Sequence, residues 1–298
     1  MGEIYRKPAV GFRSEEYVRV QSVEEAFSYL KKYGEEARII GGGITLHELG
    51  VMGSLSRVKK LIDIQQLKLD YINSEDRSIK IGASTPVYKI RDHEVFRNVA
   101  LRALAEASDF VPVQVVNNAT IGGEICTGLP ILSLPPALLA LDSSVKCVSA
   151  DGERIIPLDN FYVDYFLTEL RSDELVKEIS IPVPSAKTGS AFKYEKITAA
   201  DYPMGSVAVR FSIDQRGKCT ECRVSTGSLC RIPMRAKKTE KMLEGTDLNK
   251  QTLDKAANEI SKEIDPISDL RASADYRRRL ARVLFVETAE IALNRTKM

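Results

Sequence analysis

The pattern of apolar and polar positions marks one helix clearly near the start of the chain. Ser22 and Glu25 have the spacing of a capping box, in which the serine hydroxyl accepts a hydrogen bond from the amide of Glu25. Apolar residues recur every three or four positions over 23–30, and Gly34 is the residue type that ends many helices. We therefore predict a helix between Ser22 and Gly34, followed by a short buried strand over 37–40.

Short strand patterns alternate with turns through the next part of the chain. Residues 58–64 and 78–84 have the composition of strands, and the polar run 73–77 between them is typical of a hairpin connection. A helix is expected over 99–108, and the Asp-Gly pair at 151–152 predicts a second hairpin. This mixture of helices and strands indicates an α+β fold.

The run Ile181–Gly189 is rich in proline, serine and glycine, and it is our candidate for a linker. The pattern after it predicts three strands and then three helices, at 191–196, 205–213, 219–225, 233–243, 252–264 and 273–294. We expect a first domain over residues 1–182, with lobes at about 1–60 and 61–182, and a second domain over 190–298. The second domain is predicted to hold a three-stranded antiparallel sheet with helices.

Composition and charge exclude several classes of function. The 298 residues are 44% hydrophobic and 28% charged, as in globular proteins. With 43 basic and 41 acidic side chains, the net charge of +2 favours neither nucleic acid nor an anionic membrane as a partner. The N-terminus lacks the apolar core of a secretory signal, and no window approaches the ~18 apolar residues of a membrane span. A cytoplasmic location is expected.

The cysteines are expected to be free thiols, because five is an odd number and nothing suggests secretion. Cys219 and Cys222, with Cys230 nearby, have a spacing that could serve a metal or an iron–sulfur centre. A fourth ligand is not close in the sequence, and the pair falls on a predicted strand, so we favour ordinary core residues. The two histidines, His47 and His93, have no sequence context of a hydrolytic triad.

The arginines between 271 and 282 form a basic stripe in the last predicted helix. This stripe could face an acidic partner or a nucleotide phosphate. A solvated helix face is the simpler interpretation.

Two runs of small residues could carry cofactor chemistry. Gly41, Gly42 and Gly43 directly follow a predicted buried strand, where amides without a neighbouring Cβ can form an anion-binding nest. Their spacing fits neither a Rossmann fingerprint nor a P-loop, and alone a triple glycine is more often a tight turn. The run 119–125, predicted to be a second loop, adds the hydroxyl of Thr120. Two such loops suit the diphosphate of a dinucleotide.

The order of these two loops and the sequence around them resemble those of the FAD-binding subunits of xanthine dehydrogenase, carbon monoxide dehydrogenase and related molybdenum hydroxylases. The resemblance extends over nearly the whole chain and includes Leu134–Asp142 and Asp269–Ser273. It implies a two-lobed FAD-binding domain of the PCMH or vanillyl-alcohol-oxidase type, followed by a C-terminal domain like that of the carbon monoxide dehydrogenase flavoprotein.

The resemblance also implies which residues hold FAD, and it places no catalytic residue and no metal ligand in this chain. Lys193 is expected near the pyrimidine edge of the flavin, where a cation would stabilise the anionic reduced form. The cofactor-binding positions implied are Gly41, Gly42, Gly43, Ile44, Thr45, Leu46, Phe110, Thr120, Gly122, Gly123, Glu124, Ile125, Ser133, Val176 and Lys193.

Two positions depart from the family pattern. Glu124 stands where the family usually has Asn, and Ser133 stands where an Asp is expected. An ionised Glu accepts hydrogen bonds but cannot donate them, and its charge opposes a reduced flavin. The affinity for the flavin or its potential is therefore expected to differ from the family norm.

The function implied by the resemblance is electron relay. A large molybdopterin-binding subunit would hydroxylate the substrate, a small subunit with [2Fe–2S] centres would pass the electrons, and FAD here would deliver them to NAD⁺ or another acceptor. An (αβγ)2 assembly is expected. Two alternatives stay open: a stand-alone flavin reductase of related fold, such as enolpyruvyl-glucosamine reductase, and a scaffold subunit that has lost FAD.

Overall fold

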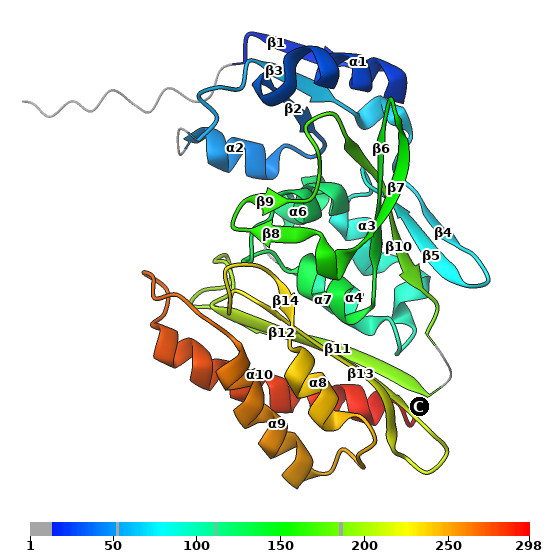
Figure 1. The fold of residues 1–298 in the computed structure, drawn as a ribbon, viewed down its shortest axis with the longest axis vertical. Coiled ribbons are helices and arrows are strands. Elements are labelled where there is room, and N and C mark those ends of the chain that lie inside the picture. The colour runs from blue at the N-terminus through cyan, green and yellow to red at the C-terminus, as the bar shows by residue number, and fades with distance from the viewer. Residues whose placement is uncertain (1–13, 52–53, 111, 185–186) are drawn as a thin grey trace, which may run out of the picture.

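The computed structural model describes residues 14–51, 54–110, 112–184 and 187–298. The start of the predicted first domain, residues 1–13, and two positions of the predicted linker, 185–186, lie outside the described residues. Three layers of sheet and helix follow one another along the long axis of the molecule (Figure 1). Within the described ranges, the length and apolar character that a membrane-crossing helix requires are not found together in any helix.

The first layer is a parallel sheet with the order β1-β3-β2. Its elements are β1 (Glu16–Arg19), α1 (Val23–Tyr33), β2 (Ala37–Ile40), α2 (Ile44–Val51) and β3 (Lys60–Asp63). The predicted first helix is confirmed, because the Ser22 hydroxyl accepts from the Glu25 amide at 3.2 Å and Gly34 ends the helix at φ +49°. The apolar face of α1 then packs Ala26 and Leu30 against the sheet.

The second layer is an antiparallel sheet with the order β4-β5-β10-β6-β7. Its strands are β4 (Ile72–Ser74), β5 (Ser78–Gly82), β6 (Ser144–Ser149), β7 (Gly152–Pro157) and β10 (Leu175–Pro182). The hairpin predicted at Asp-Gly is confirmed as β6–β7. The first predicted hairpin is wrong in its partner: β5 pairs with β4, which overlaps the predicted connection 73–77, whereas the predicted strand 58–64 contains β3 of the first layer. The short pair β8 (Tyr162–Asp164) and β9 (Leu167–Thr168) makes a separate two-stranded ribbon, and 3₁₀ turns occupy 34–36, 65–67, 94–97 and 158–160.

Five short helices fill the space beside this sheet and form the largest apolar core with it. They are α3 (Val87–Asp92), α4 (Arg102–Ala107), α5 (Val113–Asn118), α6 (Ile121–Cys126) and α7 (Leu134–Ala140). The expectation of a loop at 119–125 is wrong, because Thr120 caps α6 by accepting from the Gly123 amide at 3.2 Å. Glycine is a poor helix former, yet a Cβ at Gly122 would meet the Ala83 carbonyl oxygen at 2.7 Å. Close packing, not helix propensity, selects glycine there.

The third layer is the predicted strand meander, to which a two-residue fourth strand is added. Its strands are β11 (Thr188–Glu195), β12 (Gly205–Ile213), β13 (Cys219–Gly227) and β14 (Met234–Arg235), and its helices are α8 (Lys237–Leu243), α9 (Lys250–Glu263) and α10 (Ala274–Arg295). The helices α8 to α10 cover one face, and α4 and α7 lie against the other (Figure 1). Cys219 and Cys222 are buried in the core under α8 to α10.

One arginine of the basic stripe is not solvated. Arg277, on α10, is 2% exposed, and its guanidinium donates to the Met204 carbonyl at 3.0 Å and to the Ile267 carbonyl at 2.7 Å. The same group forms a bidentate ion pair with Asp269. This residue therefore fixes the loop that precedes α10, which is a structural role.

Ion pairs at two places join the third layer to the helices of the second. Asp142, just after α7, accepts from Arg210 at 2.5 Å, from Arg223 at 2.7 Å and from Arg235 at 3.2 Å. At the end of α10, Arg295 pairs with Glu106 of α4 and donates to the Ser190 carbonyl at 2.6 Å. Because Arg210 is 4% exposed, removing the charge of Asp142 would leave this buried cation with Glu221, 3.1 Å away, as its remaining counter-charge.

We therefore expect Asp142→Asn to lower the free energy of unfolding by roughly 2 kcal/mol, the scale of a lost charged hydrogen bond, because Glu221 still pairs with Arg210 and Arg223. Asn tolerates the positive φ of 52° at this position, so the change isolates the charge from the backbone. Urea unfolding measures the effect. Asp151→Asn, in an exposed hairpin turn, is the matched control and should stay within about 0.5 kcal/mol. Equal stability of the two variants would contradict the role of Asp142.

Candidate cofactor site

The two glycine-containing segments, 41–43 and 119–123, touch each other through their backbones. A Cβ on Gly42 would lie 1.6 Å from the carbonyl oxygen of Asn118, and a Cβ on Gly41 would lie 2.9 Å from Oγ1 of Thr120. Gly43 has φ +76°, which other residues rarely adopt. Glycine is therefore required at these positions by the close approach of two segments almost eighty positions apart in the sequence.

The segment 119–123 is fixed by hydrogen bonds to residues 83–87. The Val87 amide donates to the Ala119 carbonyl at 2.9 Å, and the amides of Ile121 and Gly122 donate to the carbonyls of Thr85 and Ala83 at 3.0 and 2.9 Å. The Gly123 amide is taken by the Thr120 hydroxyl. The amides of Ala119, Ile121, Gly122 and Gly123 are thus occupied by the protein itself.

The amides of residues 42–45 have no such partners. No hydrogen bond within the described residues uses them as donors, and those of Ile44 and Thr45 belong to the first turn of α2, where intrahelical acceptors are lacking. Free amides at a helix start attract anionic groups such as phosphates. Of the two segments, the first therefore carries a run of consecutive free amides that can bind an anion.

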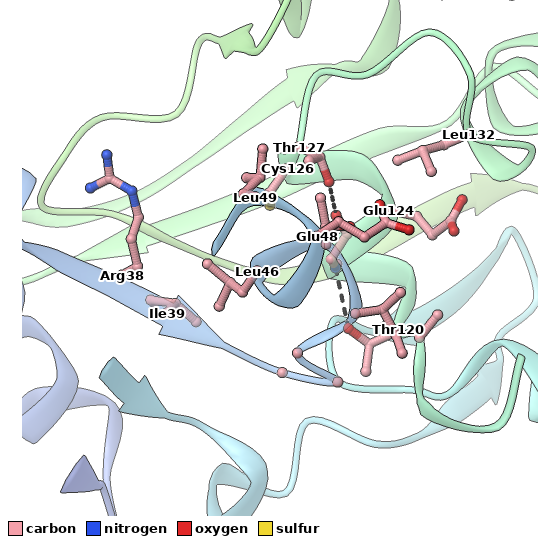
Figure 2. Close-up of a pocket in the computed structure, with 18 of the residues that line it drawn as sticks. Arg38, Ile39, Leu46, Glu48, Leu49, Thr120, Glu124, Cys126, Thr127 and Leu132 are labelled. Carbon is pink, nitrogen blue, oxygen red and sulfur yellow. Dashed lines mark hydrogen bonds between the residues drawn. The ribbon is translucent and has the colours of Figure 1, made fainter. Parts of the chain in front are cut away.

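A cavity of about 920 Å³ opens where the two segments meet. This volume is at the upper end of the roughly 300–1,000 Å³ that is usual for cofactor and ligand sites. Its walls come from β2, α2, α6, the segment before α7, and the loop 196–203 of the third layer. Figure 2 shows Ile39 and Leu46 on one wall and Thr120, Glu124 and Leu132 on another.

Most of the positions implied by the family resemblance lie on this cavity. They are Gly41, Gly42, Gly43, Ile44, Thr45, Leu46, Phe110, Thr120, Gly122, Gly123, Glu124, Ser133 and Val176. Ile125 does not line it, because its side chain points into the core and is fully buried.

Lys193 also lies away from the cavity, because its ammonium group pairs with Glu287 of α10. Successive side chains of a strand alternate between its two faces. Phe192 and Tyr194 pack on the core of the second layer, so Lys193 faces the opposite side. Lys196 follows Tyr194 at the same spacing, lies 4.6 Å from its ring centroid and lines the cavity. Burial lowers the pKa of Lys196 from its ordinary value.

A group of acidic and phenolic side chains covers one side of the cavity, and two of its members, Glu48 and Tyr202, were not predicted from the sequence. The Tyr202 hydroxyl lies 2.5 and 2.6 Å from the two carboxylate oxygens of Glu48. This hydrogen bond joins α2 to the loop after β11. Burial, with the Glu48 carboxylate second, raises the pKa of Tyr202. Glu48 and Tyr202 are 154 positions apart, so no local signal in the sequence links them.

Glu124 completes this group and is 7% exposed. Burial raises the pKa of its carboxyl to about 7, the nearby Glu48 carboxylate adds to the shift, and the amides of Leu134 and Ser133 oppose it. Its Oε2 atom has no hydrogen-bond partner in the described structure. Figure 2 shows the side chains of Glu48 and Glu124 close together beside the cavity.

Comparison with known proteins identifies the family. A model described as the FAD binding domain in molybdopterin dehydrogenase matches residues 11–184, and one described as the CO dehydrogenase flavoprotein C-terminal domain matches residues 190–292. The chain belongs to the FAD-binding subunits of the molybdenum hydroxylases. The resemblance seen in the sequence, and the α+β fold that it implies, are confirmed.

Individual relatives of this flavoprotein subunit match over nearly their full length. The chain is 32% identical over 284 residues to 6-hydroxypseudooxynicotine dehydrogenase complex subunit alpha of Paenarthrobacter nicotinovorans, covering 95% of both. It is 30% identical to the carbon monoxide dehydrogenase medium chain of Afipia carboxidovorans, covering 95% of this chain and 98% of that one. A structure of carbon monoxide dehydrogenase from Hydrogenophaga pseudoflava superposes with a TM-score of 0.91 at 28% identity, covering 96% and 99%.

The contact at Gly42 gives a direct test of the cavity in this flavoprotein subunit. Gly42→Ala should abolish FAD retention, because its Cβ would collide with a backbone oxygen at 1.6 Å that cannot move without displacing the other segment. Gly41→Ala is the graded control, since its Cβ would meet only a side-chain hydroxyl at 2.9 Å, and it should retain part of the flavin. The flavin-to-protein ratio of the purified variants measures both. Equal retention by the two variants would show that the two segments do not share a cofactor.

Proposed function

We propose that this chain holds FAD in the cavity between its glycine segments and passes electrons from a partner's [2Fe–2S] centres to NAD⁺ or another acceptor. The observation that carries the proposal is the set of free amides at 42–45, which meets an open cavity of about 920 Å³. When bound, FAD supplies the exchange between single-electron and two-electron carriers. An open cavity with unoccupied donors argues against a scaffold that has lost its cofactor.

The cofactor-binding positions proposed are the thirteen implied residues that line the cavity, with Lys196 in place of Lys193. The diphosphate would lie against the amides of 42–45, because a doubly charged group is stabilised there without a basic side chain. The Thr120 segment would then serve by shape: its glycines allow close approach, while its amides hold it to residues 83–87. Phe110 and Val176 would supply apolar contacts.

The partners proposed are a large molybdopterin-binding subunit and a small [2Fe–2S] subunit in an (αβγ)2 assembly. Support comes from relatives whose names describe subunits or medium chains of dehydrogenase complexes. We also propose a division into a FAD-binding domain over 1–182 and a second domain over 190–298. A cytoplasmic location is consistent with the five cysteines, all of which are free thiols.

Purification with its partner subunits tests the relay. The complex should contain flavin, molybdenum and iron in addition to this chain, and the reducing substrate should bleach the flavin band near ~450 nm. Addition of NAD⁺ should then restore the band. A purified chain that oxidises NADPH by itself would favour a stand-alone reductase, and a complex without flavin would favour a scaffold.

The position of the two lysines gives a matched pair of variants. Lys196→Gln should make the midpoint potential of the flavin more negative by roughly 20–40 mV, the equivalent of about 1–2 kcal/mol for a two-electron couple, because a cation near the ring favours the reduced anion. Lys193→Gln removes an exposed ion pair with Glu287 and should leave the potential unchanged. Spectroelectrochemical titration measures both potentials. A shift with Lys193→Gln alone would restore the assignment made from the sequence.

A further inference from the structure

The carboxyl group of Glu124 is a buried polar group that the fold does not satisfy. It lines the cavity with 7% of the residue exposed, and its Oε2 atom is buried without a hydrogen-bond partner in the described structure. Leaving a buried polar atom unpaired destabilises a fold. A ligand in the cavity is the group that could complete its bonding.

The surroundings of Glu124 disfavour its ionised form. The groups that interact with it are the Glu48 carboxylate from α2 and the phenols of Tyr202 and Tyr162, from the third layer and β8; the Cys126 thiol of α6 lies next to Tyr162. Burial raises the pKa of Tyr162 and raises that of Cys126 to about 12, so both keep their protons at neutral pH. None of these groups is a cation that would hold a carboxylate in its charged form.

The amides of Ser133 and Leu134 approach the Glu124 carboxyl and favour its charge, but burial outweighs them. A protonated carboxyl has one O–H donor and needs an acceptor for it. FAD offers many acceptors for such a donor, among them the oxygens of its phosphates, its ribityl hydroxyls and its ring carbonyls. An ionised Glu124 would instead repel the phosphates.

We propose that Glu124 is a cofactor-positioning residue that acts as a neutral acid, its Oε2–H donating a hydrogen bond to an oxygen of the flavin nucleotide. This inference rests on the proposed function, because it needs FAD in the cavity. It gives Glu124 a defined role as a hydrogen-bond donor that stops donating when the carboxyl group loses its proton. Affinity for FAD should therefore fall as the pH rises through neutrality.

The sign and size of the effect follow from the protonated fraction. Below a pKa of about 7 the carboxyl carries its proton and donates, and above it the charged form neither donates nor tolerates the phosphates. The Kd for FAD should therefore rise about tenfold between pH 6 and pH 8, because the protonated fraction falls by that factor. The diphosphate of FAD has no proton to lose in this range, so the cofactor itself does not titrate.

The experiment is a fluorescence titration of FAD into the full-length chain, stripped of cofactor, between pH 5.5 and pH 8.5. Glu124→Gln keeps a donor that does not titrate, so its Kd should be flat with pH. Glu124→Ala removes the donor and should bind roughly threefold to tenfold more weakly at pH 6, the equivalent of one neutral hydrogen bond. Glu35→Gln, which alters another wall of the cavity, should keep the pH dependence of the unchanged chain.

An infrared difference spectrum supplies a readout that does not depend on binding strength. The stretching band of a protonated carboxylic acid should be present at pH 6 and absent from Glu124→Gln. A Kd that is constant or falls with rising pH, or a Glu124→Gln variant with the same pH dependence as the unchanged chain, overturns this inference while leaving FAD binding in place. Absence of FAD binding at every pH overturns the proposed function and this inference with it.

Discussion

The structure depends on one close contact, the approach of the Gly42 backbone to the carbonyl of Asn118. A side chain at Gly42 would overlap that oxygen, so two chain segments from different layers can meet only where glycine stands. The contact lies between the end of β2 and the start of α2, next to the free amides of 42–45. The opposing segment is fixed by backbone hydrogen bonds to residues 83–87. A cavity wall made in this way is a property of both layers together, and neither layer could form it alone.

The two departures from the family pattern are related through one hydrogen-bonding position. Ser133 lies at the start of α7, but its side chain makes no capping bond there. The amides of Ser133 and Leu134 are approached instead by the Glu124 carboxyl, which comes from α6. In this chain an acidic group is thus absent from position 133 and present at position 124, on the neighbouring helix. Compared with the expected family pattern, the carboxyl group at position 133 is lost and one at position 124 is gained, so the cavity wall keeps one carboxyl group on a different element.

The sequence predicted the regular elements well where their signals are local. The capping box at Ser22, the Asp-Gly hairpin and the strand meander each depend on residues close together in the chain, and all are present. The helix at 121–126 was missed because its glycines argue against a helix, while the contact with Ala83 that selects them is not local. The family resemblance implied Lys193, whereas strand alternation places Phe192, Tyr194 and Lys196 on the face opposite to it. The Glu48–Tyr202 bond could not be predicted, because it joins elements that only the tertiary fold brings together.

The last turn of α10 connects two layers of the structure. Arg295 reaches back to Glu106 and to the Ser190 carbonyl, so the last turn of the molecule fastens the third layer to helix α4. Gly189 lies against the same turn, with the Ala292 carbonyl oxygen 2.3 Å from where a Cβ would be. A chain shortened by only four residues would lose this arginine and uncover the edge of β11. Affinity tags and fusion partners joined at this end therefore need a spacer that leaves the final turn of the helix intact.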